Sequence, residues 1–254
     1  MLNDYENYRM TNCIYLAWQD HSTRRWHVIG QLLRTIEGYE FRYTCGVNNI
    51  HNFYALSNMS EHNKVYYSPE LFSLFQNRLM PKSRPDYFNY LRWLGFKKEA
   101  VSVDDLDALA ISGGERETDF FRIIPVPKRN SAGTYAFKFF VNGLSHMTDE
   151  AKNRALTLCK GDSLYLAHDF QNSEDSLALF LRTENPPCLI GYVPAYFAKI
   201  IHKIKNENES SQIQINVVQI NKDAPIQMRL LCEFSSPVLN KPWEEYEDEF
   251  KLIS

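Results

Sequence analysis

The sequence predicts an α+β fold organised as two domains. Runs of alternating or continuously apolar residues, bounded by turn residues, indicate strands in both halves of the chain. Segments with apolar residues at helical spacing indicate helices between groups of these strands. The chain has 254 residues, of which 44 % are hydrophobic, and is therefore long enough for one large or two ordinary domains with proper cores.

The first half begins with a small antiparallel sheet. We expect residues 1–12 to form a flexible leader and residues 13–127 to form the first domain. The first two strands face each other across a turn at 20–23, which predicts a hairpin, and the third strand alternates strictly between polar and apolar residues. The strands are expected at residues 13–18, 26–32 and 39–45.

Helix signals follow in the same domain. Ser68 as an N-cap and Pro69 at the first helical position predict a helix over residues 68–80. Two glycines, Gly95 and Gly113, mark the ends of two further helices. These helices and a closing strand are expected at residues 85–95, 103–110 and 120–126.

The polar segment 128–134 is the best candidate for a linker. It is followed by a second domain over 135–238 and by an acidic and aromatic tail over 239–254. In the second domain, helices are expected over 149–158 and after Pro194, which suits the first turn of a helix. Strands are expected at residues 135–141, 164–168, 177–183, 188–193, 212–220 and 226–234.

Composition and motifs limit the classes of function. No stretch of eighteen apolar residues occurs and the start is polar, so we expect a soluble, cytoplasmic protein. The five cysteines are odd in number and never form a C-x-x-C, so neither a disulfide framework nor a zinc site is indicated. No nucleophile elbow, H-E-x-x-H or phosphate loop is found. We therefore expect no metal, no cofactor and no enzymatic activity.

The second half of the sequence resembles the HIRAN domain, a small β-barrel module with helices. The resemblance lies in a strand led by Gly161-Asp162, a polar loop, an Ala-hydrophobic strand at 178–179 and a Gly-Tyr-Val-Pro sequence at 191–194. Asn172 and Asp175 stand at the matching loop positions, while Phe170 and Ser173 replace the two prolines of the pattern. The resemblance implies a HIRAN-like β-barrel with helices that binds DNA, either single strands or 3′ ends.

The resemblance also implies which residues contact DNA. Phe139 and Phe140 stand where the helicase-associated HIRAN version has an aromatic pair for base stacking, and Asp175 stands where it has an acidic reader. The alternatives are that one of these phenylalanines belongs to the core and that Asp175 only braces its own loop. The full predicted nucleic-acid-binding set is Phe139, Phe140, Asp169, Asn172, Asp175, Tyr192 and Lys199.

Residues 13–126 resemble, in order and motifs, the N-terminal subdomain of HipA-type kinases. The resemblance is carried by Phe41-Arg42-Tyr43, the segment 71–80, Leu94-Gly95 and Ser112-Gly113-Gly114, among others. It implies docking to a HipA-type kinase, and it does not imply phosphoryl transfer by this chain alone.

Between residues 76 and 98, basic residues outnumber acidic ones and aromatic residues lie among them. Such a patch could bind a nucleic-acid backbone or an acidic protein surface, and the alternative is a solvated helix face with its aromatics inside. The residues assigned to it are Arg78, Lys82, Arg84, Arg92 and Trp93.

Two functions are compatible with these features. The first is a bacterial, non-catalytic accessory protein that binds DNA, as single strands or 3′ ends, through its HIRAN-like domain. The alternative is an antitoxin-like interaction subunit that docks a HipA-type kinase or a partner in a defence system. The net charge of −3 gives no overall nucleic-acid signature, so the first function requires a local basic surface.

Overall fold

The computed structural model describes residues 11–51, 53–96, 103–129, 134–207, 213–236 and 245–253. Unit 1 groups Met1–Leu79, Asp104–Gly133 and Asn240–Ser254, and unit 2 groups Met80–Val103 and Thr134–Leu239. Antiparallel sheets combined with helices confirm the predicted α+β class. The domain bounds proposed from the sequence stay a prediction, and most of the leader, linker and early tail lies outside the described residues.

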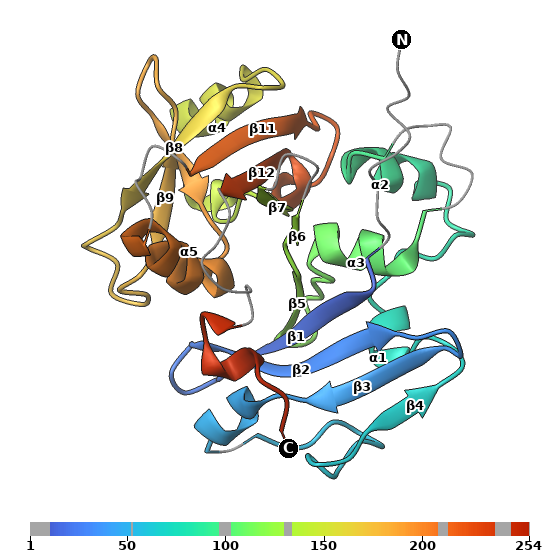
Figure 1. Ribbon diagram of the computed structural model, residues 1–254. Coiled ribbons are helices and arrows are strands. Elements are labelled where there is room, and N and C mark those ends of the chain that lie inside the picture. Colours follow the sequence, from blue (N-terminus) through green and yellow to red (C-terminus); the bar gives the residue numbers. More distant parts are fainter. Residues whose placement is uncertain are drawn as a thin grey trace. The chain divides into compact units, whose positions relative to one another are not determined.

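Unit 1 is built on a five-stranded antiparallel sheet with the order β4-β3-β2-β1-β5 (Figure 1). The first two strands form the predicted hairpin, in which Cys13 pairs with Leu33. Side chains from the strands and from α3 form one apolar cluster, with Ile14, Leu32 and Phe41 fully buried. The strands are β1 (Cys13–Gln19), β2 (Trp26–Arg34), β3 (Tyr39–Tyr43), β4 (Tyr66–Ser68) and β5 (Phe121–Pro125).

The helix predicted over residues 68–80 is wrong at both ends. Ser68 is the last residue of β4, where it pairs with Tyr39, so its backbone belongs to the sheet and cannot cap a helix. Helix α1 begins at Ser73, ends at Gln76 and buries Phe75 in the core. It is preceded in the chain by a short 3-10 helix, η1 (Cys45–Asn49).

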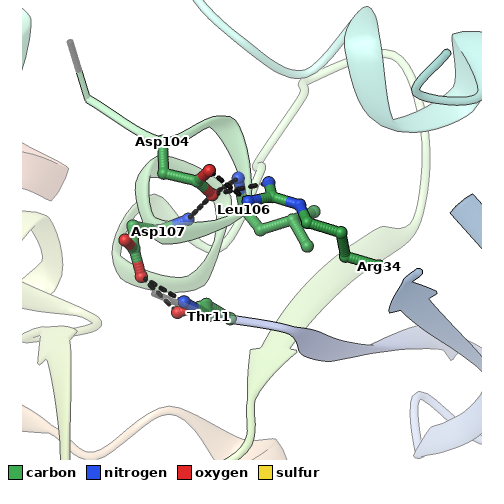
Figure 2. Close-up of polar contacts among 5 residues, drawn as sticks. All are labelled: Thr11, Arg34, Asp104, Leu106 and Asp107. Atoms are coloured by element: carbon green, nitrogen blue, oxygen red, sulfur yellow. Dashed lines mark hydrogen bonds and ion pairs between the residues drawn. The ribbon is translucent and has the colours of Figure 1, made fainter. Parts of the chain in front are cut away.

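Helix α3 (Asp105–Ser112) is fixed to the sheet by polar contacts at its first turn (Figure 2). Asp104 caps the helix by accepting from the backbone N–H groups of Leu106 at 2.9 Å and Asp107 at 3.3 Å. The same carboxylate pairs with both terminal nitrogens of Arg34 on β2, with an Nη2–Oδ1 distance of 2.8 Å. Asp107 in turn accepts from the backbone and hydroxyl of Thr11, so one helix end is tied to two other segments.

A second sheet has seven strands in the order β10-β9-β8-β11-β12-β7-β6. The pairings from β7 to β10 are all antiparallel. Strand β9 begins at Leu179 rather than at the predicted residue 177, because the N–H groups of Leu177 and Ala178 both donate to Asp175 in the preceding loop. The strands are β6 (Lys128–Arg129), β7 (Tyr135–Phe140), β8 (Ser163–His168), β9 (Leu179–Arg182), β10 (Leu189–Tyr192), β11 (Gln214–Ile220) and β12 (Leu230–Ser236).

This second sheet curls until two distant strands meet. Asn142, just after β7, and Tyr192 of β10 exchange two backbone hydrogen bonds of 2.9 and 2.8 Å. Gly191 makes this approach possible, because a Cβ there would lie 2.5 Å from the Cγ1 of Val141 and 2.6 Å from the carbonyl oxygen of Asn142. The bridge joins β10 to the end of β7, as a barrel-like closure requires.

Helix α5 (Ala195–Glu207) supplies much of the core of unit 2, with Phe197, Ile201 and Ile204 each no more than 1 % exposed. The strand predicted over 226–234 divides into a 3-10 turn, η4 (Ile226–Met228), and β12, because three residues from Ile226 form the turn before the ladder starts. The remaining elements are η2 (Leu144–His146), α4 (Asp149–Leu156) and, in unit 1, η6 (Asp248–Phe250).

Helix α2 (Tyr87–Trp93) groups with unit 2, where it contacts the turn between β11 and β12. Asn221, which is 1 % exposed, donates from its amide to the carbonyl oxygen of Trp93 at 2.9 Å. Gln219 donates to the carbonyl oxygen of Arg92 at 2.7 Å, and the Arg92 guanidinium pairs with Asp223. In the described part of the chain, no helix has the length and apolar character needed to cross a membrane.

Candidate functional site

The loop between β8 and β9, residues 169–178, is held by its own polar side chains. Asp169 accepts from the N–H of Gln171 at 3.2 Å. Asn172 accepts from the N–H groups of residues 174 and 175 at 3.0 and 2.9 Å, and Asp175 accepts from that of Leu177 at 2.9 Å. Such side-chain to backbone bonds replace the ladder that the loop lacks. The bracing role left open for Asp175 is therefore present in the structure.

Three of the predicted site residues meet at the closure of the sheet. The hydroxyl of Tyr192 donates to Oδ2 of Asp169 at 2.8 Å, and the amide of Asn172 donates to the same oxygen at 3.3 Å. The Tyr192 ring stacks on Phe180 with centroids 4.2 Å apart, and its edge lies so close to Gly143 that a Cβ there would be 3.0 Å away. The ring therefore has neighbours on two sides and serves chiefly to position Asp169.

The surroundings of Tyr192 change its acidity. Partial burial, followed by the hydrogen bond to the negative Asp169, raises the pKa of Tyr192 to about 12, because both disfavour the phenolate. The phenol is thus a hydrogen-bond donor at neutral pH, and it stabilises the carboxylate of Asp169 at the base of the loop.

A second group of rings was not predicted from the sequence. Phe170, at the start of the loop, is 85 % exposed, and its ring lies against His168 with centroids 4.1 Å apart. His168 also contacts His202 of α5, ring to ring at 4.9 Å. The Nε2 atoms of His168 and His202 lie 2.8 and 3.1 Å from the carbonyl oxygens of Ser176 and Leu177, respectively. The two histidines therefore hold the end of the loop.

Burial is the main reason that the pKa of His202 lies below its ordinary value, and the nearby Lys205 adds to the lowering. The signal for this group was an aromatic residue at the loop position where the HIRAN pattern has a proline. The ring at that position packs against the preceding His168.

Phe139 and Phe140 lie in the interior, where they are 2 % and 7 % exposed. Phe139 contacts the rings of Phe137 and Phe197, with centroids 6.0 and 6.4 Å apart. The sequence analysis allowed that one of these two phenylalanines belongs to the core, and the structure places both of them there. Neither ring offers an open face on which a base could stack.

Lys199 is exposed on α5, three residues before His202, so both lie on the same side of the helix. Lys203, four residues after Lys199, is exposed along the same side, and Lys205 is partly exposed. The helix thus carries positive charge next to the histidines that hold the loop.

The five residues of the predicted basic patch do not share one environment. Arg78 belongs to unit 1, and its side chain is 1 % exposed. It donates to the carbonyl oxygen of Gly114 at 2.9 Å and to Asp119 at 2.7 Å, and burial lowers its pKa. The Arg78 side chain therefore connects the segment after α1 to the segment before β5 inside unit 1.

The other four patch residues belong to unit 2. Arg84 pairs with Asp86 at 2.9 Å, and Arg92 pairs with Asp223, which also accepts from the indole N–H of the buried Trp93 at 3.3 Å. Lys82 is exposed. The neighbouring lysines at 97 and 98 lie outside the described residues.

Comparisons with known proteins give one structural similarity. No family model and no curated protein matches the chain. A solved structure, the crystal structure of the HIRAN domain of human HLTF, is similar over 47 % of this chain and 93 % of that chain, with 17 % sequence identity and a TM-score of 0.32. A TM-score this low does not define a shared fold, so the site is interpreted from its own geometry. The resemblance of the first half to HipA-type kinases stays a prediction.

Proposed function

We propose that unit 2 binds single-stranded nucleic acid, with DNA as its ligand, on the surface formed by the loop 169–178 and helix α5. The observation that carries the proposal is the Phe170 ring, which is 85 % exposed and rests on His168. An apolar ring held in water by a partner that fixes its orientation suits stacking on a nucleobase.

Charge next to this ring supports the same ligand. Single strands are bound by combining stacking with a positive surface that follows the phosphates. Lys199 and Lys203 present such charge along one side of α5, on the helix whose His202 contacts His168. A positive helix beside an exposed ring can therefore engage a backbone and a base of one strand, although the whole chain is slightly acidic.

A preference for the 3′ end of a DNA strand would come from the hydrogen-bonding groups at the base of the loop. Asp169 and Asn172 are held in fixed positions by Tyr192 and by backbone bonds. The carboxylate of Asp169, held in this way, can accept from a terminal 3′ hydroxyl or from a base edge, and the amide nitrogen of Asn172 can donate to a base edge. We therefore propose that the loop also gives the surface a preference for 3′ ends.

The test is a fluorescence-anisotropy titration of the full chain with labelled single-stranded DNA whose 3′ ends are free or blocked, beside duplex DNA, at two salt concentrations. We expect saturable, salt-sensitive binding to single strands that weakens in a variant with Lys199→Ala and Lys203→Ala. The matched control is Lys152→Ala with Lys160→Ala, which removes the same charge elsewhere in unit 2. Flat titrations at low salt would rule out the proposal, and equal binding to blocked ends would remove only the preference for ends.

The two sequence resemblances also suggest in which kind of cell the protein works and with which partner. We propose a non-catalytic accessory role in a bacterial cell, where another protein supplies the catalysis. The HipA-type resemblance makes a HipA-type kinase or a defence-system protein the first partner to test.

Docking of a protein partner is the second candidate function. It is favoured by two exposed apolar side chains of unit 1: Tyr67 on β4, which is 70 % exposed, and Ile36 in the turn between β2 and β3, which is 106 % exposed. Tyr67 lies on the edge strand β4, and edge strands can pair with a strand from another protein. Calorimetric titration of a HipA-type kinase into the wild type and a Tyr67→Lys variant tests it. Heat of binding that the substitution abolishes would support docking, and no heat with the wild type would exclude it.

A further inference from the structure

The strands β8, β9 and β10 turn one of their two faces away from the core of unit 2. Their inward positions include Leu164, Leu181 and Ile190, which are 4 %, 0 % and 0 % exposed. Side chains alternate along a strand, so the residues between these positions lie on the opposite, outer face. Two residues of the outer face, Tyr165 and Leu189, are each 40 % exposed. Solvent therefore reaches this face of the sheet.

The first row of side chains on the outer face adjoins the loop 169–178. It contains Phe180 of β9 and its pair Tyr192 of β10, whose rings stack with centroids 4.2 Å apart. The hydroxyl of Tyr192 reaches from this row to Asp169 at 2.8 Å. The outer face is therefore continuous with the hydrogen-bonding groups to which we assign the preference for 3′ ends.

A second row lies two residues further along β9, which corresponds to about 7 Å. Here Arg182 pairs with Tyr165 of β8 on one side and with Leu189 of β10 on the other. The guanidinium carbon of Arg182 lies 5.2 Å from the centroid of the Tyr165 ring. This cation–π contact orients both side chains on the surface.

Arg182 retains hydrogen-bonding capacity in this position. Its Nη1 donates to the carbonyl oxygen of Thr183 at 3.1 Å, and no carboxylate in the described part of the chain forms an ion pair with it. A guanidinium has five N–H donors, so several remain available for an anion. Arg78, Arg84 and Arg92, in contrast, each pair with an aspartate. The positive charge of Arg182 is thus available on a partly exposed surface.

We infer that the outer face of β8, β9 and β10 is a further nucleic-acid contact site, on which a single strand continues from its 3′ end at the loop. The inference rests on the proposed function, because it follows the strand that Asp169 holds at its end. Arg182 binds a phosphate and Tyr165 stacks on a base, which are the two kinds of contact that single-strand binding combines.

The spacing of the two rows indicates which nucleotide reaches the second one. A separation of about 7 Å corresponds to about two nucleotides at the rise of stacked bases. A phosphate and the face of a base carry little sequence information, so binding at this row should depend little on base sequence.

Photo-crosslinking of the wild-type chain locates the strand directly. Single-stranded DNA with 5-iodouracil at one position at a time, starting from the 3′ end, is irradiated with the full chain, and the crosslinked residue is identified by mass spectrometry. We expect a crosslink to Tyr165 from a nucleotide upstream of the 3′ end. A strand that binds and never crosslinks to Tyr165 would overturn the inference. This measurement needs no variant and is unaffected by folding defects.

Anisotropy titrations of variants at several salt concentrations measure the contribution of Arg182. Arg182→Gln should weaken binding about tenfold and reduce the slope of log affinity against log salt by about one, because one phosphate contact is lost. Arg182→Lys retains the charge and should keep the slope. The matched control is Arg229→Gln, because Arg229 of unit 2 is also partly exposed and donates to a carbonyl oxygen, that of Ala224.

The contribution of Tyr165 is measured in the same way. Tyr165→Leu should weaken binding at least about fivefold, because a stacking ring is lost. Phe88→Leu is its control, since Phe88 is an exposed ring of unit 2 outside this face.

The variant with Lys199→Ala and Lys203→Ala separates this inference from the proposed function. Binding that persists in that variant and is lost with Arg182→Gln would support the outer face and refute the surface on α5. Binding that is lost with the lysines and is unchanged by Arg182→Gln and Tyr165→Leu would overturn the inference and leave the proposed function standing. A flat titration of the wild type would overturn both.

Discussion

The hydroxyl of Tyr192 donates to the carboxylate of Asp169 across 2.8 Å, and this bond connects β10 to the loop that follows β8. Tyr192 is also the residue whose backbone pairs with Asn142 where the sheet closes. The position of the loop is therefore coupled to the closure of the sheet through one side chain. Changes at Tyr192 should affect both the stability of unit 2 and the binding that we propose for the loop.

Tyr192→Phe removes the donor and retains the ring. We expect a loss of about 1 kcal/mol in the free energy of unfolding at neutral pH, because the carboxylate of Asp169 loses one partner and retains Asn172. The phenol of the folded state, with a pKa of about 12, keeps its proton at pH values where an unfolded tyrosine, with a pKa of 10.0, loses it. Wild-type stability should therefore fall as the pH rises from 10 to 12.

The pH-dependent part of this prediction is measured by urea unfolding at a series of pH values, and the absorbance of tyrosinate identifies the group. The difference between the wild type and Tyr192→Phe isolates one tyrosine among fifteen. A Tyr192 that titrates near pH 10 in the folded protein would contradict the bond to Asp169.

Phe170→Ala tests the exposed ring in the proposed DNA interface. We expect a loss of about 1 to 3 kcal/mol in the free energy of binding to single-stranded DNA, the range found when a stacking aromatic is removed. Stability should change little because the ring is 85 % exposed. Phe88→Ala on α2 is the matched control, since Phe88 is 75 % exposed and lies far along the chain from the loop. Equal anisotropy curves for both variants would refute the role of Phe170.

The sequence predicted those features that local patterns determine. The apolar spacing that ends at Gly113 predicted the position of α3 to within two residues, because a left-handed glycine acts within one turn, whereas the capping role of Asp104 was found only in the structure. Alternation predicted β3, and Pro194 predicted the start of α5. Ser68 and Pro69 were misleading because pairing between β4 and β3 competes with capping there.

Features that depend on distant pairing could not be predicted in the same way. The burial of Arg78 could not be predicted, because its partner, Asp119, lies 41 residues away in the sequence and no local pattern acts over that distance. Asp169, Asn172 and Tyr192, which the resemblance to the HIRAN pattern placed in one set, are joined by hydrogen bonds, and their contact with DNA stays a prediction. It gave no role to Phe170, because the pattern has a proline at that position, and so the most exposed ring of the loop was missed.

Substitution of Asn221 tests how much its hydrogen bonds to helix α2 contribute to the stability of unit 2. Its amide donates to the carbonyl oxygens of Trp93 at 2.9 Å and Met228 at 2.8 Å in a buried setting. Asn221→Ala leaves two acceptors without their donor, so we expect a loss of about 1 to 3 kcal/mol in the free energy of unfolding. Asp223→Ala, which removes a surface ion pair with Arg92, should cost clearly less. Urea unfolding of both variants would show it, and the reverse order would contradict this account.

Asp104 combines a helix cap with an ion pair, and two substitutions separate these roles. Asn is as good a cap as Asp, so Asp104→Asn should lose only the pair with Arg34. Asp104→Ala should lose the cap as well, and its free energy of unfolding should be lower by about a further 1 kcal/mol. Thermal and urea unfolding in low and high salt distinguish the two, because salt screens the pair and leaves the cap. Equal stability of the two variants would show that the cap contributes nothing.

The C-terminal segment 245–253 belongs to unit 1, and its stability should depend on pH through Glu249, whose Oε1 lies 3.0 Å from Nδ1 of His27. Burial alone would raise the pKa of Glu249, but hydrogen bonds from His27 and Asn49 outweigh it, so the pKa lies below the ordinary value of 4.5. The unfolded chain therefore binds a proton at a higher pH than the folded chain does. The stability contributed by Glu249 is fully present above pH 4.5 and is lost as the pH falls through the lowered pKa of the folded state.

Glu249→Gln removes this ionisation and retains the shape of the side chain. The variant should unfold more easily than the wild type at neutral pH, and the difference between the two should shrink as the pH falls below 4.5. The measurement is urea unfolding over this range, followed through Trp18 and Trp26 of unit 1, with Glu245→Gln, an exposed position in the same C-terminal segment, as the control. A difference that stays constant with pH would mean that the carboxylate is not ionised in its site on unit 1.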